Sequence, residues 1–119
     1  MGIHPKFLID IVSKMRDENG QTLVHKAALA LKDPQKYFLN SLLELGFASH
    51  EADNWGRGPL SVCLKMDSAS LHRIVYVFLK HGVDPGMTPT RKDGSKGCNF
   101  IRDFLLSPHG QLNDIAEMI

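Results

Sequence analysis

The sequence has little of what marks most specialised classes of protein. Only two cysteines occur in 119 residues, too few for the disulfide framework of a small secreted domain. Lys and Arg number 14 against 13 Asp and Glu, for a formal net charge of +1, whereas nucleic-acid binders usually carry a basic excess. No apolar run approaches the roughly 20 residues that cross a bilayer. We therefore expect neither a membrane nor a nucleic-acid partner.

The N-terminal residues and the two cysteines indicate the cellular compartment. Residues 1–6 lack the basic, then apolar, then small-residue layout of a secretory signal. Cys63 and Cys98 both fall at apolar-patterned positions, where a reduced thiol packs like a small apolar side chain. We expect both to be free core thiols of an intracellular protein, in the cytoplasm or the nucleus.

What the sequence does contain is a repeat. Residues 17–28 (DENGQTLVHKAA) are echoed by residues 53–64 (DNWGRGPLSVCL), 36 positions later. Each copy leads to an apolar stretch that ends in glycine, at Gly46 and at Gly82, again 36 apart. A period of this size indicates stacked supersecondary units, which usually form binding surfaces rather than catalytic pockets.

Apolar spacing and capping residues predict the helices of the first unit. An apolar stripe predicts a helix over residues 5–15 with one buried face. Thr22 is expected to cap a short helix that runs to about Leu31. Asp33-Pro34 is expected to begin a second helix, which Gly46 ends in the left-handed conformation. The apolar face of that second helix is predicted to be Phe38, Leu39, Leu42 and Leu43.

The same order recurs twice. Pro59 is predicted to open a short helix to about Lys65, and Asp67 to cap a longer one that Gly82 ends. Leu71, Ile74, Val75, Phe78 and Leu79 form its predicted apolar face. In a degenerate third unit, a short helix is expected over 98–106 and a final helix from Ser107-Pro108. The chain stops inside that last apolar helix, so we expect it to be part of a longer protein.

These repeats resemble the ankyrin repeat, whose pattern is D-x-x-G-x-T-P-L-H-x-A-A, then a second helix, then G-A-D. The first copy matches at Asp17, Gly20, Thr22, His25, Ala27 and Ala28. The second matches at Asp53, Gly56, Pro59 and Leu60 and closes on Gly82-Val83-Asp84, and the third keeps only Gly94. The resemblance implies an all-α solenoid of about three stacked helix-turn-helix units in one domain. Its parts would be a cap helix 5–15, repeat one 17–52, repeat two 53–90, and a degenerate, truncated repeat three 91–119.

Two departures from the family pattern matter. The family's Thr-x-x-His hydrogen bond is available to Thr22 and His25, but Gly58 and Ser61 replace that pair in the second copy. We therefore expect the second turn to be looser. The period of 36 instead of the family's 33 places about three extra residues in each loop between paired helices.

The resemblance also implies a function, a non-catalytic adaptor or scaffold module that binds another protein. Family members bind through the finger turns and the exposed face of the first helix of each pair. The corresponding residues here are Glu18, Asn19, Gln21, Asn54, Trp55, Arg57, Lys65 and Lys92. Acidic at one end, aromatic in the middle and basic at the other, this surface would suit an extended peptide or a helix of matching polarity.

Alternatives stay open at three places. Trp55 either anchors a partner or folds back onto the neighbouring finger. The basic cluster of Arg91, Lys92, Lys96 and Arg102 either meets an acidic partner or an RNA backbone, or is simply solvated. A second function, self-association into a homodimer, would use the apolar residues Leu112, Ile115 and Ile119 of the last repeat.

No catalytic, cofactor or metal site is predicted. The six histidines show no H-x-x-x-H spacing, and neither cysteine belongs to a C-x-x-C pair. The segment Gly94-Ser95-Lys96-Gly97 lacks the G-x-x-x-x-G-K-[ST] pattern of a phosphate loop. We therefore expect no cofactor and no enzymatic activity.

Overall fold

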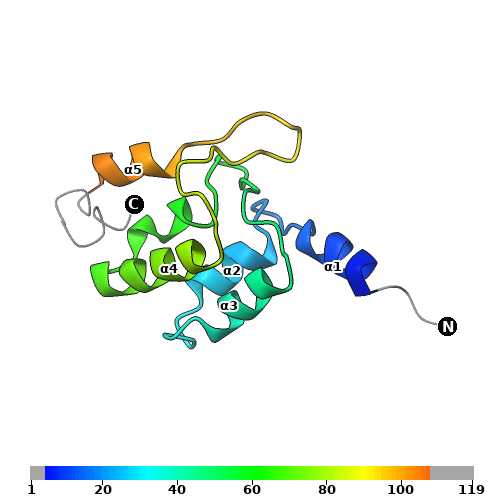
Figure 1. Cartoon of the computed structure of the whole chain (residues 1–119). Helices are drawn as coiled ribbons and strands as arrows, with labels where there is room; N and C mark the ends of the chain where they lie inside the picture. Colours follow the sequence, from blue (N-terminus) through cyan, green and yellow to red (C-terminus); the bar gives the residue numbers. More distant parts are fainter. Residues whose placement is uncertain (1–4, 108–119) are drawn as a thin grey trace.

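The computed structural model describes residues 5–107, and this part of the chain is all-α, as predicted (Figure 1). Its elements in chain order are α1 (Pro5–Ser13), α2 (Leu23–Leu29), α3 (Tyr37–Glu44), the 3₁₀ helix η1 (Ser61–Lys65), α4 (Ser68–Lys80) and α5 (Phe100–Leu106). No strand forms within these residues. Two isolated bridges join Thr90 to Glu51 and to Lys96.

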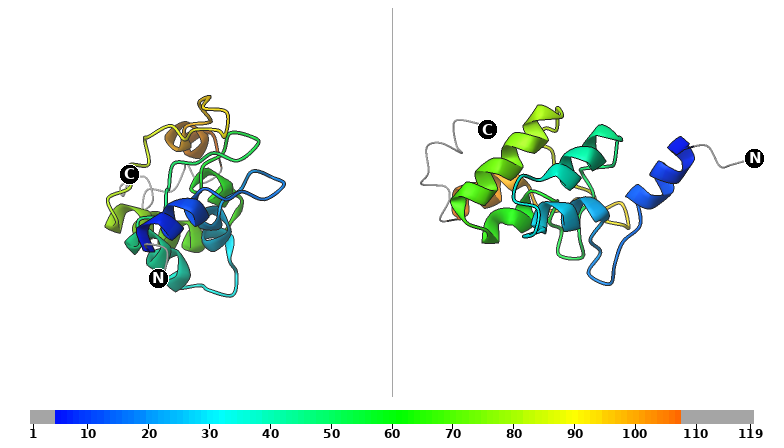
Figure 2. Two further views of the ribbon diagram at one scale, coloured as in Figure 1. Left: turned by 90° about the vertical axis from the view of Figure 1, so that its right-hand side faces the viewer. Right: turned by 90° about the horizontal axis from the view of Figure 1, so that it is seen from below.

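The helices lie in two rows. Along one row α1 contacts α2, α2 contacts η1, and η1 contacts α5, while α3 packs against α4 in the other row (Figure 2). Across the rows α2 packs on α3 and η1 on α4, so each short helix is paired with the longer helix that follows it. The turns at residues 17–21, 53–57 and 91–95 project from one side of these rows, at the upper right in the left view of Figure 2. We call them the first, second and third fingers.

The core lies between the two rows and forms one apolar cluster. Ala27 and Ala28 of α2 are almost completely buried, and their small side chains let neighbouring helices approach closely. The predicted face of α4 is confirmed at Leu71, Ile74, Val75 and Phe78. For α3 the prediction is confirmed at Leu39 and Leu42 and wrong at Phe38, whose side chain is 47% exposed.

The two long helices end in the same way. Gly46 and Gly82 follow α3 and α4 closely and have left-handed backbones, with φ of 90° and 76°. Each glycine amide donates to the carbonyl three residues back, at 3.1 and 3.0 Å, and the next amide donates to the carbonyl five residues back, at 3.0 Å in both copies. This is the Schellman motif, which satisfies carbonyls left open at a helix end. The predicted glycine stops are therefore confirmed.

The largest boundary error is at the start of α3. The helix begins at Tyr37 instead of Asp33-Pro34, because Lys36 has a left-handed backbone (φ 58°) that interrupts it. Asp33 still caps the helix from outside. Its carboxylate accepts the amides of Tyr37 at 3.1 Å and Phe38 at 2.8 Å.

Smaller boundary errors have local causes. α1 ends at Ser13 and α2 at Leu29, each two residues before the predicted end. α5 begins after Asn99, whose side chain accepts the amide of Arg102, and not at Cys98. As a result Cys98 lies outside the helix and is half-buried, so the prediction of a core thiol is right for Cys63 and wrong for Cys98. The predicted final helix, with Leu112, Ile115 and Ile119, lies outside the described residues.

Candidate protein-binding surface

The first two fingers share one hydrogen-bonding scheme. The carboxylate of Asp17 accepts the amides two and four residues later, both at 2.9 Å. Asp53 accepts the corresponding amides at 3.0 and 2.8 Å. Gly20 and Gly56 complete the two turns with φ of 76° and 81°. The repeated aspartate and glycine therefore build the same turn twice.

The third finger closes differently. Arg91 occupies the position of the repeated aspartate, so no carboxylate at that position can accept hydrogen bonds from the amides of the turn. Asp93 accepts hydrogen bonds instead, from the amide of Ser95 at 2.9 Å and from its hydroxyl at 2.6 Å. Gly94 keeps the left-handed backbone, with φ of 89°. The fold of the turn therefore persists although its usual anchor is absent.

Adjacent fingers are joined through their backbones. The Asn54 amide donates to the carbonyl of Asn19 at 3.0 Å, and its side chain donates to the carbonyl of Glu18 at 2.9 Å. Between the second and third fingers, the Cys98 amide donates to the carbonyl of Gly56 at 2.6 Å. A Cβ added to Gly97 would lie 2.3 Å from that carbonyl oxygen. The three turns therefore form a continuous, closely spaced ladder.

Arg16 adds side-chain bonds to this ladder. Its guanidinium donates to the carbonyl of Gly20 at 3.1 Å and also contacts the carbonyl of Ala52 and the carboxylate of Glu51. The side chain thus joins the first finger to the segment that enters the second. A basic residue just before the repeated aspartate was the sequence signal for this role, and we did not use it.

Beneath the fingers, the predicted pairing of Thr22 with His25 is confirmed. His25 Nδ1 lies 3.0 Å from Thr22 Oγ1 and 3.2 Å from its amide nitrogen. The second finger lacks this pair but has an ion pair in its place. Arg57 Nε and a terminal nitrogen both lie 3.1 Å from the carboxylate of Asp53. Asp53 is only 1% exposed, so Arg57 balances a charge that is out of contact with water.

The eight predicted binding residues fall into two groups. Six are exposed: Glu18, Asn19, Asn54, Trp55, Lys65 and Lys92. Gln21 is buried, and its amide lies 3.5 Å from the carboxylate of Asp53, so its prediction as a contact residue is wrong. Arg57 is half-buried and held by Asp53. Lys65 lies at the end of η1 and not on a finger.

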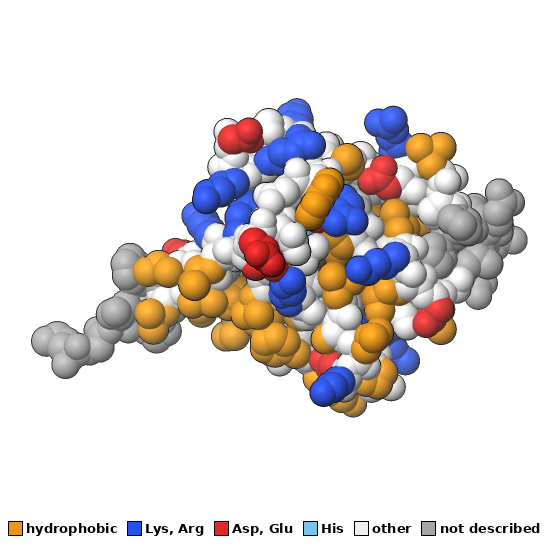
Figure 3. All heavy atoms as spheres, turned by 180° about the vertical axis from the view of Figure 1, so that it is seen from behind, with side chains coloured by type: hydrophobic (Ala, Val, Ile, Leu, Met, Phe, Trp, Pro, Cys, Tyr) orange, Lys and Arg blue, Asp and Glu red, His pale blue; other side chains and the backbone are white. Residues whose placement is uncertain are grey.

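The structure brings part of this set together. Asn54 and Lys92 line one hollow of about 320 Å³ between the second and third fingers, together with Arg91 and Asp93. Positive side chains gather along the upper edge of the molecule in Figure 3, the edge at which the third finger lies in Figure 1. The hollow is open to solvent and lined by charged and polar residues, as the rim of a protein interface is.

Trp55 projects from the tip of the second finger. Its side chain is 57% exposed, and the guanidinium of Arg57 lies 5.2 Å from the ring centroid. The ring therefore contacts a residue of its own turn, and more than half of its surface is exposed. This exposure favours the interpretation in which Trp55 anchors a partner.

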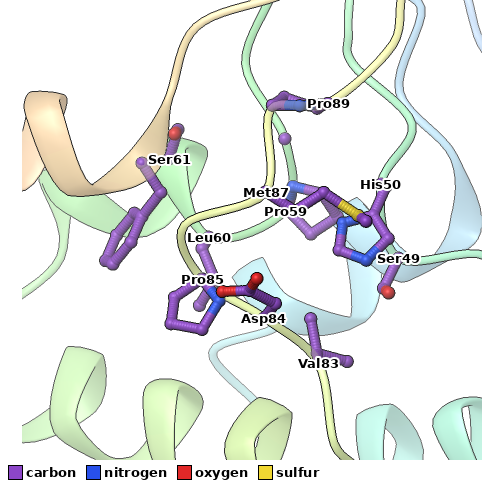
Figure 4. Close-up of a pocket in the computed structure, with 12 residues that line it drawn as sticks. Ser49, His50, Pro59, Leu60, Ser61, Val83, Asp84, Pro85, Met87 and Pro89 are labelled. Atoms are coloured by element: carbon purple, nitrogen blue, oxygen red, sulfur yellow. The ribbon is translucent and has the colours of Figure 1, made fainter. Parts of the chain in front are cut away.

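One pocket contains the residue types of a catalytic triad. Ser61, His50 and Asp84 line a cavity of about 20 Å³ (Figure 4). Ser61 lies well apart from the other two in this view, and Asp84 accepts the amide of Gly86 at 2.8 Å. No hydrogen bond joins the three side chains, so they form no nucleophile–base pair of the kind that such chemistry needs.

Within residues 5–107, no three His, Cys, Asp or Glu side chains are grouped so that they could hold a metal ion. None of the helices in that range has the length and apolar character of a membrane span.

Burial raises the pKa of the Cys63 thiol to about 12, which leaves it protonated and unreactive at neutral pH.

Comparison with known proteins adds no relative. No family model matches the chain, and neither a curated protein nor a solved structure matches it. An assignment of family must therefore depend on the repeated residues and on the geometry described above.

Two structural residues were missed entirely by sequence reasoning. Lys36 is only 2% exposed, and its ammonium donates to the carbonyl of Ala30 at 2.6 Å. Nothing in the sequence distinguishes this lysine from a surface one. The guanidinium of Arg91 packs against Gly56, where an added Cβ would meet it at 2.5 Å. Arg91 was interpreted only as part of a charged cluster.

Proposed function

We propose that this chain is an ankyrin-repeat module that binds another protein through its fingers, as a non-catalytic intracellular adaptor or scaffold. Three observations support the family. The two rows pair each short helix with the following long one. The fingers built on Asp17 and Asp53 have the same bonds. Gly46 and Gly82 end their helices identically. The aspartates of the two fingers and the two terminal glycines are each 36 residues apart.

The exposure of Trp55 supports the binding function most directly. An indole that is 57% exposed at a turn tip leaves apolar surface in water, and tryptophan is enriched among residues that dominate interface energies. The turn below it is fixed by Asp53, by the backbone of Asn19 and by the Arg57 guanidinium. A partner would therefore meet an aromatic side chain whose position is already set, which lowers the entropic cost of binding.

The test is affinity capture from an extract of the source cells, with the wild-type chain and the Trp55→Ala variant side by side. We expect at least one protein to be retained by the wild type and lost by the variant. The partner identified in this way should bind Trp55→Ala more weakly by about 2 kcal/mol or more. Equal retention of every protein by both chains would count against the finger surface.

Self-association is a second candidate, favoured by exposed apolar residues of α1 and of the segment just after it. Leu8 and Ile11 of α1 and Met15 beyond its end are 45%, 47% and 62% exposed, and apolar side chains that gather on a surface favour association. In Figure 3 hydrophobic side chains cover this end of the molecule. Sedimentation over a wide concentration range tests it, with Ile11→Glu as the variant that should remain monomeric.

A further inference from the structure

A second surface lies on the row formed by α3 and α4, away from the fingers. A hollow of about 180 Å³ lies between these helices, and both tyrosines of the chain, Tyr37 from α3 and Tyr76 from α4, line it. Their side chains are 72% and 54% exposed. A second hollow of about 240 Å³ adjoins the first, since Tyr76 and Arg73 line both. Figure 2 shows α3 and α4 running side by side.

The charge of this groove has one sign. Arg73 and Lys80 line it and are exposed, and His72 lines the adjoining hollow. No Asp or Glu lines either hollow. The three ion pairs of the described residues involve Arg16, Lys26 and Arg57, so the two cations of the groove have no carboxylate partner there. This contrasts with Arg16, Lys26 and Arg57, in or near the first two fingers, which are paired.

The floor of the groove is fixed. His81 Nε2 lies 2.7 Å from Asn40 Oδ1 and links the end of α4 to α3. Val77, only 5% exposed, lines the floor between the helices. The walls therefore keep their spacing without a ligand, and the two tyrosines stand on opposite sides of a preformed hollow.

We infer that the α3–α4 groove binds an acidic peptide segment of a partner protein. An apolar or aromatic side chain of the segment would enter between Tyr37 and Tyr76, and carboxylates beside it would pair with Arg73 and Lys80. Tyrosine and arginine are the residue types enriched in such contacts. Because the groove is lined by positive side chains, charge complementarity requires a negatively charged ligand. This site is separate from the finger surface and does not depend on it.

A peptide fits these observations better than a nucleic acid. Affinity for a phosphate backbone comes from many Lys and Arg side chains that each displace a counterion. The groove offers two such cations, and the net charge of the whole chain is only +1. Two cations around an aromatic hollow instead match a short segment with a few carboxylates.

The experiment uses the full chain and the fluorescein-labelled peptide Glu-Asp-Glu-Phe-Glu-Asp-Glu, with binding followed by fluorescence anisotropy. We expect saturable binding that weakens as ionic strength rises and that falls about tenfold or more in the double variant Arg73→Glu/Lys80→Glu. Tyr76→Ala should also weaken it. Because all three side chains are exposed, these variants should fold, and circular dichroism checks that they do.

The matched control is Lys14→Glu/Arg102→Glu, which makes the same change of charge at exposed positions outside the groove. It should bind like the wild type, and so should Trp55→Ala. Amide NMR shifts on peptide addition should fall on α3 and α4. No saturable binding would overturn the proposal, as would an equal loss in the control, shifts confined to the fingers, or tighter binding of single-stranded oligouridine. Loss of binding in Trp55→Ala would place the acidic site on the fingers instead.

Discussion

The Nε2 atom of His25 lies 3.0 Å from the carbonyl oxygen of Arg57 and joins the first repeat to the second. The other ring nitrogen, Nδ1, accepts the amide of Thr22 at 3.2 Å. An amide can only donate, so Nδ1 carries no proton and Nε2 must carry it and donate to Arg57. The buried ring is therefore neutral and held as one tautomer.

This arrangement predicts a loss of stability on mild acidification. Burial is the main reason why the pKa of His25 lies below its ordinary value of 6.5. Between the lowered pKa and 6.5 the unfolded chain binds a proton that the native state does not. The free energy of unfolding therefore decreases as pH falls below about 6.5. Urea unfolding between about pH 7.5 and pH 5 measures the effect.

The control for this prediction is His25→Gln, which cannot titrate. Its overall stability should be lower, but its unfolding free energy should change less over the same pH range. Asp17, Asp67 and Asp93 do not contribute to the change in stability over this pH range. Hydrogen bonds lower their pKa values below 3.8, mainly from Lys26 to Asp17, from Ser70 to Asp67 and from Ser95 to Asp93. Their contribution is lost only in more acidic solution. An unchanged pH slope in His25→Gln would contradict the assignment.

Trp55 and Arg57 should separate binding from stability, although they are neighbours in one turn. Trp55→Ala removes a mostly exposed ring, so the free energy of unfolding should change by less than about 1 kcal/mol. Arg57→Ala leaves the buried carboxylate of Asp53 without its cation and should cost about 2 to 4 kcal/mol. Thermal and urea unfolding of both variants measures this. A larger loss for Trp55→Ala than for Arg57→Ala would mean that the indole belongs to the stack.

Glycines in the third finger test how closely the turns are joined. A Cβ at Gly97 would lie 2.3 Å from the carbonyl oxygen of Gly56, whereas one at Gly94 would meet nothing within 4 Å. Gly94→Ala should therefore cost only about 1 kcal/mol, for its left-handed backbone (φ 89°). Gly97→Ala should cost clearly more, about 2 kcal/mol or above. It should also speed hydrogen exchange at the Cys98 amide, which bonds to Gly56. Equal effects of the two substitutions would contradict the ladder.

A feature of the fold could be predicted from the sequence where the residues that determine it are close together in the chain. Capping and turn residues act within a few positions, and so the glycine stops at Gly46 and Gly82 and the Asp67 cap were predicted correctly. The start of α3 was not, because Lys36 has a left-handed backbone and a buried side chain whose ammonium bonds to the carbonyl of Ala30, and no local signal in the sequence indicates either feature.

The binding surface shows the same limit. Trp55 was correctly placed at an exposed turn tip, but Gln21 was wrongly placed in solvent, since only the packing of one finger on the next buries it. The α3–α4 groove left a signal that we did not use. Arg73, Tyr76 and Lys80 recur at spacings of three and four on the face of α4 opposite its apolar stripe. The opposite wall, with Tyr37, depends on how α3 and α4, which are separated by η1 in the chain, pack together.

The two cysteines give a test of the whole stack in one measurement. Cys63 is completely buried, its thiol lies 3.2 Å from the carbonyl of Pro59, and burial raises its pKa to about 12. Cys98 is half-buried at the junction of the third finger and α5. Since the thiolate is the reactive species, a disulfide reagent at neutral pH should modify Cys98 readily and Cys63 only after unfolding. Mass spectrometry after digestion identifies the modified residue.

Urea supplies the reference state, in which both thiols should react at similar rates. The matched variant Cys98→Ser should show almost no fast reaction in the folded state. Its slow reaction should occur at the rate at which the stack unfolds, because Cys63 belongs to η1, which packs on α2, α4 and α5. Rapid modification of Cys63 under native conditions would mean that η1 is not covered by its neighbours. The stacked arrangement proposed for the chain would then be wrong at its centre.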